Sequence, residues 1–292
     1  MLGTDRDERI DDAQVDNSQK LMAPLDSGSI AAEAVLAFND LPAGSAYGTL
    51  LHDLLEWQFE HGWPIAAASP SLAMTSEWDA MLGRKTQRLK LDEAQSKLLG
   101  EWVKQLVQAA LVVPGVSKDG KPLILSQLDS GSAWAEMAFT LQVHKLSASR
   151  VDSMIGQHVL AGQTRQPLQP LQLEGMLVGF MDLVLEHEGK YFVLDYKSNR
   201  LPSYGAESLQ SAILAHRYDV QYTLYVLALH RLLKSRIADY DYDQYVGGAI
   251  YWFLRGIDQP GAGVFADKPP KALIEALDHA FSQNVYTPAV AP

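Results

Sequence analysis

The sequence predicts an α/β domain in which a central mixed sheet is flanked by helices. Three observations lead to this expectation. Residues 171–199 form two β-rich runs around a short polar turn, helical periodicity precedes and follows them, and another β-rich run, GGAIYWFLRG, comes later in the chain. The 292 residues are 47 % hydrophobic and 20 % charged, which is ordinary for a globular protein with a sizeable core.

The remaining elements follow from local patterns. In SAYGTLLHDLLEWQFE the leucines recur at helical spacing, and Ser45 is the expected N-cap. A second helical region is expected after Asp92 and closes at Pro114-Gly115. A strand within AEMAFTLQV and a helix over 147–160 come next. After the paired strands we expect one long helix over 208–237, the strand in GGAIYWFLRG, and a closing helix in PPKALIEALDHAFSQ.

The first forty residues differ from the rest of the chain. Residues 1–40 hold nine acidic and three basic side chains, so they carry −6 of the net charge of −11. We expect them to be an acidic linker or tail, disordered in part, ahead of one domain over residues 41–292. A net charge of this sign is unusual for a protein that touches DNA, but its concentration in the tail leaves a nucleic-acid substrate open.

Several classes of protein are excluded. The chain has no cysteine, so it forms no disulfide, thiolate zinc site or iron–sulfur cluster, which fits a cytoplasmic location. No apolar run approaches the ~18 residues of a membrane span, and the acidic start MLGTDRDERIDD does not resemble a signal peptide, so we expect no membrane association. The motifs of P-loop ATPases, GxSxG hydrolases and HExxH metalloproteases are absent.

The two strands within 171–199 bring two aspartates together. If the chain turns through residues 188–189, His187 faces Lys190, and counting back places Asp182 directly opposite Asp195. Directly opposed residues share one face of a sheet, with Cβ atoms about 4.5–5.5 Å apart. Since Glu-Gly is not the strongest turn pair, this register depends on the turn assignment.

The opposed carboxylates indicate a metal site. They repel each other unless a cation lies between them, and Mg²⁺ prefers oxygen ligands. Lys197 lies two residues after Asp195, so it points to the same face and can reach a water or phosphate oxygen. The alternative is that both aspartates are exposed on an outer sheet face. The apolar flanks of GFMDLV and VLDYKSN argue for burial, and buried charges are rarely tolerated unless paired or bound to metal.

Other polar side chains are candidates to join this site. His52 shares a helix face with Glu56 and could bind metal, although a lone histidine is more often structural. Gln221 and Tyr225 lie one helical turn apart. The tyrosines of that helix are explained equally well by core packing, whereas Gln221 needs a partner such as a strand residue, DNA or a metal-bound water. Glu136, in AEMAF, either turns into the site or is an ordinary surface glutamate.

These stretches together resemble a known family. AYGTLLHDLLE, AEMAF, GFMDLV, LDYKSN and AHRYDVQYTLYVLALHR are similar to the C-terminal nuclease domains of RecB proteins, in the PD-(D/E)xK nuclease superfamily. The likeness runs from about residue 42 to 285 and is dense from 173 to 258. It implies a restriction-endonuclease-like core of helix, three strands, helix and strand, with extra helical insertions around a central mixed sheet.

The resemblance also implies roles for individual residues. The expected metal ligands are three side chains and one main-chain carbonyl: His52, Asp182, Asp195 and Tyr196. The expected catalytic group comprises the two aspartates, the lysine that orients the attacking water, and the family's QxxxY motif: Asp182, Asp195, Lys197, Gln221 and Tyr225. The implied cofactor is Mg²⁺, with Mn²⁺ or Ca²⁺ able to substitute in binding.

By the same resemblance, the chain is a deoxyribonuclease of the exonuclease V type. Its substrate would be mainly single-stranded DNA, its partners RecC, RecD and RecA, and its roles double-strand break repair and degradation of foreign DNA. RecB proteins carry a helicase ahead of this domain, so we expect an excised domain with residues 1–40 as interdomain linker, a free-standing nuclease being the alternative. The rival function is a docking module for RecA, RecC or an inhibitor, with weak or no cleavage.

Overall fold

A five-stranded mixed sheet lies at the centre of the protein. The computed structural model describes residues 38–67, 71–114, 121–128, 131–259 and 263–282. The strands follow in the order β1-β2-β3-β4-β5, and all neighbours are antiparallel except β3 and β4, which are parallel. Their bounds are Ala133–Ser147 (β1), Gln172–His187 (β2), Lys190–Lys197 (β3), Val246–Phe253 (β4) and Val264–Asp267 (β5).

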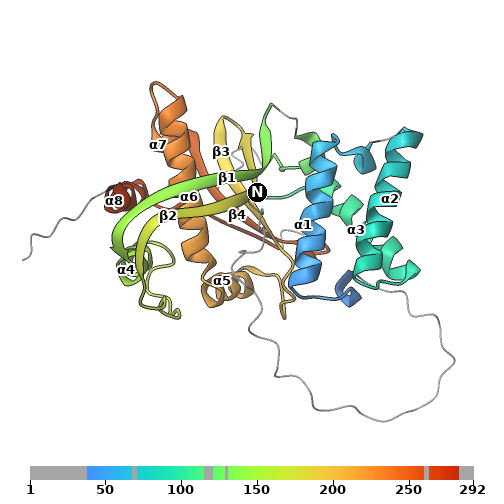
Figure 1. Ribbon diagram of the computed structural model, residues 1–292, viewed down its shortest axis with the longest axis horizontal. Coiled ribbons are helices and arrows are strands. Elements are labelled where there is room, and N and C mark those ends of the chain that lie inside the picture. Colours follow the sequence, from blue (N-terminus) through green and yellow to red (C-terminus); the bar gives the residue numbers. More distant parts are fainter. Residues whose placement is uncertain (1–37, 68–70, 115–120, 129–130, 260–262, 283–292) are drawn as a thin grey trace, which may run out of the picture.

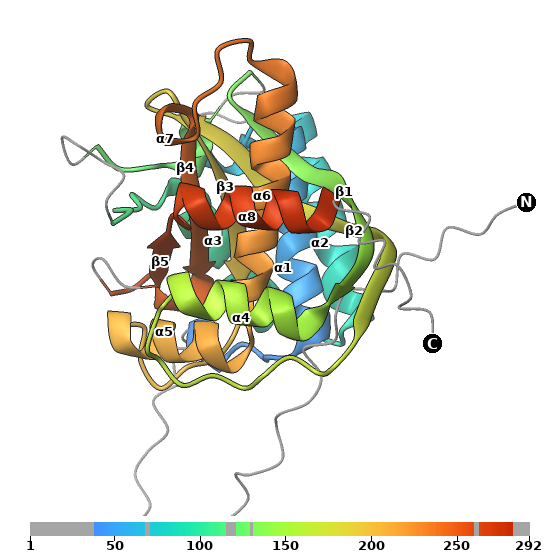
Figure 2. The ribbon, with the colours of Figure 1, turned by 90° about the vertical axis from the view of Figure 1, so that its left-hand side faces the viewer.

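Helices cover both faces of the sheet (Figures 1 and 2). One face carries α1 (Ser45–Glu60), α2 (Leu72–Arg88) and α3 (Glu93–Gln108). The other carries α4 (Ala148–His158), α5 (Ala206–Ala215), α6 (Tyr218–Arg236) and α8 (Lys271–Ser282), with the short α7 (Tyr242–Tyr245) before β4. The expected core of helix, three strands, helix and strand is therefore confirmed, with α4 inserted between the first two strands.

The first helix follows its leucine pattern closely. Leu50, Leu51, Leu54 and Leu55 are all buried against the sheet, as the spacing predicts. The predicted cap is wrong by one residue. Ser45 is the first residue of α1, and Gly44 is the N-cap, at φ 117° and without a side-chain cap.

The long helix expected over 208–237 is broken into α5 and α6. Arg217, between them, adopts a left-handed conformation with φ 56°. Its guanidinium binds Asp152 at 2.6 Å and Asp219 at 3.1 Å. Because both acids are buried or nearly so, this ion-pair network holds the chain in the break, and sequence periodicity alone does not reveal it.

The region between the first helix and β1 also departs from expectation. No helix was expected over the residues of α2. Helix α3 begins after Asp92, which forms a capping box with Gln95. It ends at Gln108, earlier than Pro114, because Leu111 pairs with Leu123 in an isolated β-bridge. The edge strand β5 was not expected either.

The acidic segment 1–40 falls largely outside the described residues, so its disorder stays a prediction. Its last three residues, Phe38–Asp40, form a short 3₁₀-helix. Arg200 and Arg255 donate to the Asn39 carbonyl at 2.6 Å and the Phe38 carbonyl at 3.2 Å, which ties this end to the domain. Among the described helices, none is both long and apolar enough to cross a bilayer.

The sheet forks between β2 and β3. Pairing of these strands ends at Leu183 and Leu194, whereas β1 and β2 stay paired to Ser147 and Gln172. This two-stranded extension, here called the β1–β2 arm, curves around the α4 and α8 side in Figure 1. The strand twists at the fork, so that residues two apart no longer share a face. Met181 packs with the α6–α8 core, whereas Leu183 packs with the α1–α3 core.

Candidate active site

The turn and register of the hairpin are as predicted. Both turn residues, 188 and 189, have positive φ, 53° and 77°, the conformation of a type I′ turn. His187 pairs with Lys190, and the pairing continues to the fork. The next position in this register sets Asp182 opposite Asp195. The two aspartates therefore lie where β2 and β3 begin to separate.

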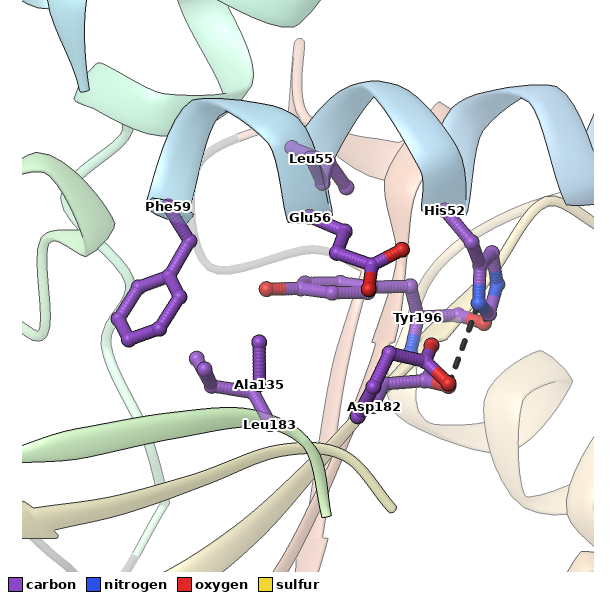
Figure 3. A pocket seen from close by; sticks show the side chains of 9 residues that line it. His52, Leu55, Glu56, Phe59, Ala135, Asp182, Leu183 and Tyr196 are labelled. Carbon is purple, nitrogen blue, oxygen red and sulfur yellow. Dashed lines mark hydrogen bonds and ion pairs between the residues drawn. The ribbon is translucent and has the colours of Figure 1, made fainter. Parts of the chain in front are cut away.

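Asp182 fills the gap that the fork opens. Where the strand ladder would continue, the Tyr196 N–H donates to Asp182 Oδ2 at 2.8 Å. Asp182 Oδ1 lies 3.2 Å from His52 Nδ1, and His52 Nε2 is 3.0 Å from the Tyr196 carbonyl oxygen. Figure 3 shows His52 reaching down from α1 to Asp182. Three of the four predicted metal ligands, from three separate elements, thus meet directly.

A close approach of α1 to β3 makes this contact possible. A Cβ atom at Gly48 would lie 3.1 Å from Ser198 Oγ, just past the end of β3. A side chain at this position would fit only if the Ser198 hydroxyl shifted by a few tenths of an ångström. Because His52 is one turn after Gly48, this close approach of helix and strand lies directly beside the imidazole.

The hydrogen bonds of His52 favour its protonated form. The Tyr196 carbonyl can only accept, so Nε2 carries a hydrogen, and Nδ1 faces a carboxylate oxygen. Burial lowers the pKa of His52, but the charge and hydrogen bond of Asp182 outweigh burial and raise it above its ordinary value. Burial likewise raises the pKa of Asp182, but His52, Lys197 and the Tyr196 N–H outweigh it and lower that pKa. We therefore expect a proton between His52 Nδ1 and Asp182 Oδ1, in a position from which a bound cation would displace it.

Asp195 pairs with Lys197 on the other side of the fork. Lys197 Nζ lies 2.8 Å from Asp195 Oδ2, and both side chains are almost wholly buried. Burial, only partly offset by Lys197 and reinforced by repulsion from Asp182, raises the pKa of Asp195 to about 6. The Tyr218 ring lies 4.1 Å from Lys197 Nζ, which adds a cation–π contact.

Gln221 connects the lysine to two tyrosines. Its Oε1 accepts from Lys197 Nζ at 3.2 Å and from the Tyr251 hydroxyl at 2.7 Å, while its Nε2 donates to the Tyr225 hydroxyl at 3.0 Å. The need of Gln221 for a partner is therefore met partly by a strand residue, Tyr251 of β4. Tyr251 was not expected at the site. It arrives there because the parallel pairing of β3 and β4 sets it beside Asp195.

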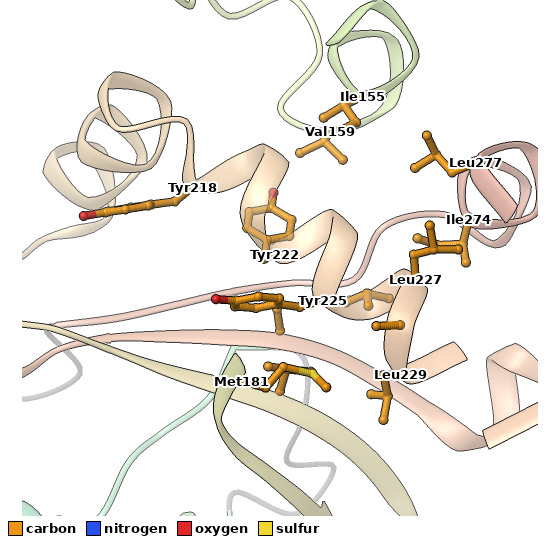
Figure 4. Packing of buried hydrophobic residues seen from close by; sticks show 14 of the residues in the cluster. Ile155, Val159, Met181, Tyr218, Tyr222, Tyr225, Leu227, Leu229, Ile274 and Leu277 are labelled. Atoms are coloured by element: carbon orange, nitrogen blue, oxygen red, sulfur yellow. The ribbon is translucent and has the colours of Figure 1, made fainter. Parts of the chain in front are cut away.

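The tyrosines of α6 also serve the core, as their spacing indicated. Tyr218, Tyr222 and Tyr225 are 4, 0 and 8 % exposed. Figure 4 shows all three projecting from α6, with Tyr225 directed toward the strands. Tyr225 makes an edge-to-face contact with Phe139 of β1, with ring centroids 5.6 Å apart. Its hydroxyl bonds Gln221 while its ring packs, so it contributes to both core and site.

Glu136 completes the acidic group. It lies in β1 opposite Asp182 in register, at φ 46°, an unusual conformation for a strand residue. His52, Glu136 and Asp182 offer ligand atoms that all lie within 4.8 Å of one another, and across the described ranges this is the one such group of three. Asp195 is outside that group, because it faces Lys197.

The donor set suits a divalent cation. Carboxylates, an imidazole and a main-chain carbonyl converge on a pocket with several acidic groups nearby, and oxygen-rich sites of this kind favour hard cations. The pocket lies between α1 and the first three strands (Figure 3). It is lined by His52, Leu55, Glu56, Phe59, Ala135, Glu136, Asp182, Leu183 and Tyr196.

Comparison with known proteins gives a consistent result. Over 278 residues the chain is 39 % identical to the RecBCD enzyme subunit RecB of Escherichia coli, an alignment covering 91 % of this chain and 22 % of that protein. It is 36 % identical to the RecB subunit of Haemophilus influenzae, covering 83 % of this chain and 19 % of the relative. For Mycobacterium tuberculosis RecB the identity is 30 %, covering 81 % and 24 %.

The chain therefore spans about a fifth of the length of these relatives. The expected resemblance to the nuclease domain of RecB is confirmed, and the site residues lie within the matched region. A family model described as the PD-(D/E)XK nuclease superfamily matches residues 32–287, nearly the whole domain. The chain belongs to the PD-(D/E)XK nuclease superfamily.

Proposed function

We propose that this domain hydrolyses phosphodiester bonds of DNA with the help of a divalent cation, Mg²⁺ in the cell. The observation that carries the proposal is the fork itself. On one side lie the ligand atoms of His52, Glu136 and Asp182, and on the other a buried lysine–aspartate pair. A site that combines metal ligands with a fixed ammonium group suits a reaction that builds up negative charge on phosphate.

The proposed ligands are His52, Asp182, Asp195 and the Tyr196 carbonyl, joined by Glu136. A bound divalent cation supplies Lewis acidity at the phosphoryl oxygen and acidifies an attacking water. Mn²⁺ or Ca²⁺ would substitute in binding. For Asp195 to join the ligands, its carboxylate must share its charge between the cation and Lys197, which one oxygen on each side allows.

Lys197 has a separate task. Its ammonium is held by Asp195, Gln221 and the Tyr218 ring, so it cannot swing away from the fork. Its pKa is raised, because its attraction to Asp195 outweighs the opposing effect of burial. Lys197 therefore stays charged, and it would orient the attacking water and stabilise the charge that develops on the phosphate. Gln221 and Tyr225 fix its position from α6.

The biological setting follows from the relatives, which are named as RecB subunits of RecBCD enzymes. We infer an exonuclease V type of activity on single-stranded DNA, with RecC and RecD as partner subunits and RecA as a further partner. The roles would be double-strand break repair and degradation of foreign DNA in the cytoplasm. Because the chain matches about a fifth of each relative, the activity to test first is cleavage by this chain alone.

One assay distinguishes this proposal from the docking-module alternative. The chain is incubated with end-labelled single-stranded DNA and Mg²⁺, with and without EDTA. We expect cleavage that EDTA abolishes and that fresh Mg²⁺ restores. An Asp182→Asn variant prepared in the same way guards against a contaminating nuclease. Cleavage that survives in Asp182→Asn, or no cleavage by the parent chain, would leave docking as the better account.

A further inference from the structure

The outer face of the β1–β2 arm carries exposed apolar side chains. Met176, Val178 and Phe180 of β2 are 64, 60 and 55 % exposed. They alternate with Leu177 and Met181, which pack into the core below. Exposed apolar residues clustered in this way mark interaction surfaces more often than bare protein surface.

This apolar row leads into the site. Leu177 and Met181 pack with the core under α4, α6 and α8, so the row lies on the opposite side of β2, the side from which α1 brings His52 to Asp182. At about 3.3 Å per residue, Phe180 is about 7 Å from Asp182 along β2, and Met176 about 20 Å. Any polymer with one bond at the fork and a chain running along β2 must lie on this row.

The face has no charge along that length. The residues of β1 paired with the row are Ala138, Thr140 and Gln142, all exposed and uncharged. A duplex presents phosphates outward and would gain little from such an uncharged surface. Unpaired bases expose their flat faces, and those faces stack on aromatic and apolar side chains.

The β1–β2 arm is also held in place by side-chain packing beneath the row. Phe139 of β1 lies over Gly179 of β2, where a Cβ atom would come within 2.6 Å of its ring. The same ring contacts Tyr225 of α6. The row is therefore packed against the helix whose Gln221 bonds Lys197. A rigid apolar surface costs little conformational entropy when a ligand binds to it.

We propose that Met176, Val178 and Phe180 form a stacking platform for the unpaired bases of a DNA strand whose scissile phosphate lies at Asp182. This inference rests on the proposed nuclease function and adds to it a reason for preferring single strands. Phe180, as the aromatic residue next to the fork, contributes most. Because the contact is apolar, its contribution to affinity is independent of salt, whereas phosphate contacts weaken with salt.

The test measures binding and chemistry separately. Affinity for a fluorescent oligo(dT) is measured by anisotropy in Ca²⁺ at two salt concentrations, for the parent chain, Phe180→Ala and the double variant Met176→Gln/Val178→Thr. The matched control is Leu72→Ala, which removes an 87 % exposed leucine from α2. Thermal midpoints check folding. Hydrolysis of the p-nitrophenyl ester of thymidine 5′-phosphate reports the metal centre alone, because this substrate is too short to reach the row.

We expect Phe180→Ala to weaken oligo(dT) binding by roughly 5- to 100-fold, by the same factor at both salt concentrations. Ester hydrolysis and the control should be unchanged. Unchanged oligo(dT) affinity in both row variants would overturn the platform, and the row would then be assigned to contact with a protein partner. Equal loss of ester hydrolysis would show that Phe180 only supports the fork. A parent chain that binds oligo(dT) through Phe180 but hydrolyses neither substrate would refute the nuclease proposal and not the platform.

Discussion

Replacing Lys197 with alanine separates chemistry from folding at the fork. If its ammonium stabilises charge on the phosphate, its loss should slow cleavage by a factor of about 100 to 1,000, equivalent to about 2.7–4 kcal/mol of transition-state stabilisation. Binding of the cation should be retained, since the loss of a neighbouring positive charge offsets the cost of removing the proton that Asp195 takes up. The rate is thus expected to fall while the affinity does not.

The cost to folding can be worked from Asp195, the partner left behind. Asp195 is 2 % exposed, and its pKa is already about 6. Without Lys197 that pKa rises further, and at pH 7 the carboxyl takes up a proton rather than remain charged. The additional penalty is then limited to about one pKa unit, or ~1.4 kcal/mol. For a domain of this size that corresponds to a fall of a few degrees in thermal midpoint.

The assay combines three measurements on the same preparations. They are the initial rate on single-stranded DNA in Mg²⁺, Ca²⁺ affinity by calorimetry, and the thermal midpoint with and without Ca²⁺. Lys190→Ala, which removes a half-buried lysine at the start of the same strand, away from the fork, is the matched control. We expect Ca²⁺ to restore the midpoint of Lys197→Ala without restoring its rate. A near-normal rate would refute the catalytic role, and a collapsed transition even with Ca²⁺ would make the lysine structural.

Three further predictions concern the surroundings of the fork. Tyr251→Phe removes a hydrogen bond to Gln221, so we expect a loss of about 1 kcal/mol in urea unfolding and a three- to tenfold slower cleavage, and an unchanged rate would remove Tyr251 from the site. Asp152, whose pKa is lowered because its bonds to Arg217 and a backbone N–H outweigh burial, stabilises the fold above pH ~4 and loses that effect as pH falls through its lowered pKa. Asp152→Asn should therefore unfold about 1–2 kcal/mol more easily at pH 7, with the gap closing in acid, and a gap that stays constant as pH falls below ~4 would contradict this sign. Finally, the raised pKa of His52 means that metal binding displaces a proton, so Ca²⁺ affinity should fall as pH falls. Calorimetry in two buffers should show proton release that His52→Asn reduces, leaving the share of Asp195, whose pKa is about 6; equal proton release in the variant would place the titrating group elsewhere.

Local sequence signals were sufficient for the centre of the fold. The positive-φ turn at 188–189 and the alternation around it set the register of β2 and β3, and with it the opposition of Asp182 and Asp195. The helix that carries His52 was visible from its leucines. These features are predictable because each depends on residues within a few positions of one another.

Features that depend on distant contacts could not be predicted. The break between α5 and α6 is held by Arg217 and Asp152, which lie 65 residues apart. Tyr251 reaches the site only through the parallel pairing of β3 with β4, and a sequence does not specify which strands become neighbours across a helix. Both depend on tertiary structure, which overrides local propensity.

The position of Glu136 was predictable only in part. Its stretch, AEMAF, indicated a strand, and a turn into the site was one of two readings left open. Its place beside His52 and Asp182 depends on the β1–β2 register and on the twist of the arm at the fork. Neither follows from alternation, because the alternating pattern changes face at that point.

The most direct test of the metal centre is a crystal of this domain soaked in Mn²⁺, with anomalous diffraction to locate the ion. We predict a single strong peak at the fork, about 2.0–2.6 Å from a carboxylate oxygen of Asp182 and within bonding distance of His52 and the Tyr196 carbonyl. The His52–Asp182 pair should open to admit the ion. No peak at the fork, with His52 and Asp182 still paired, would contradict the account.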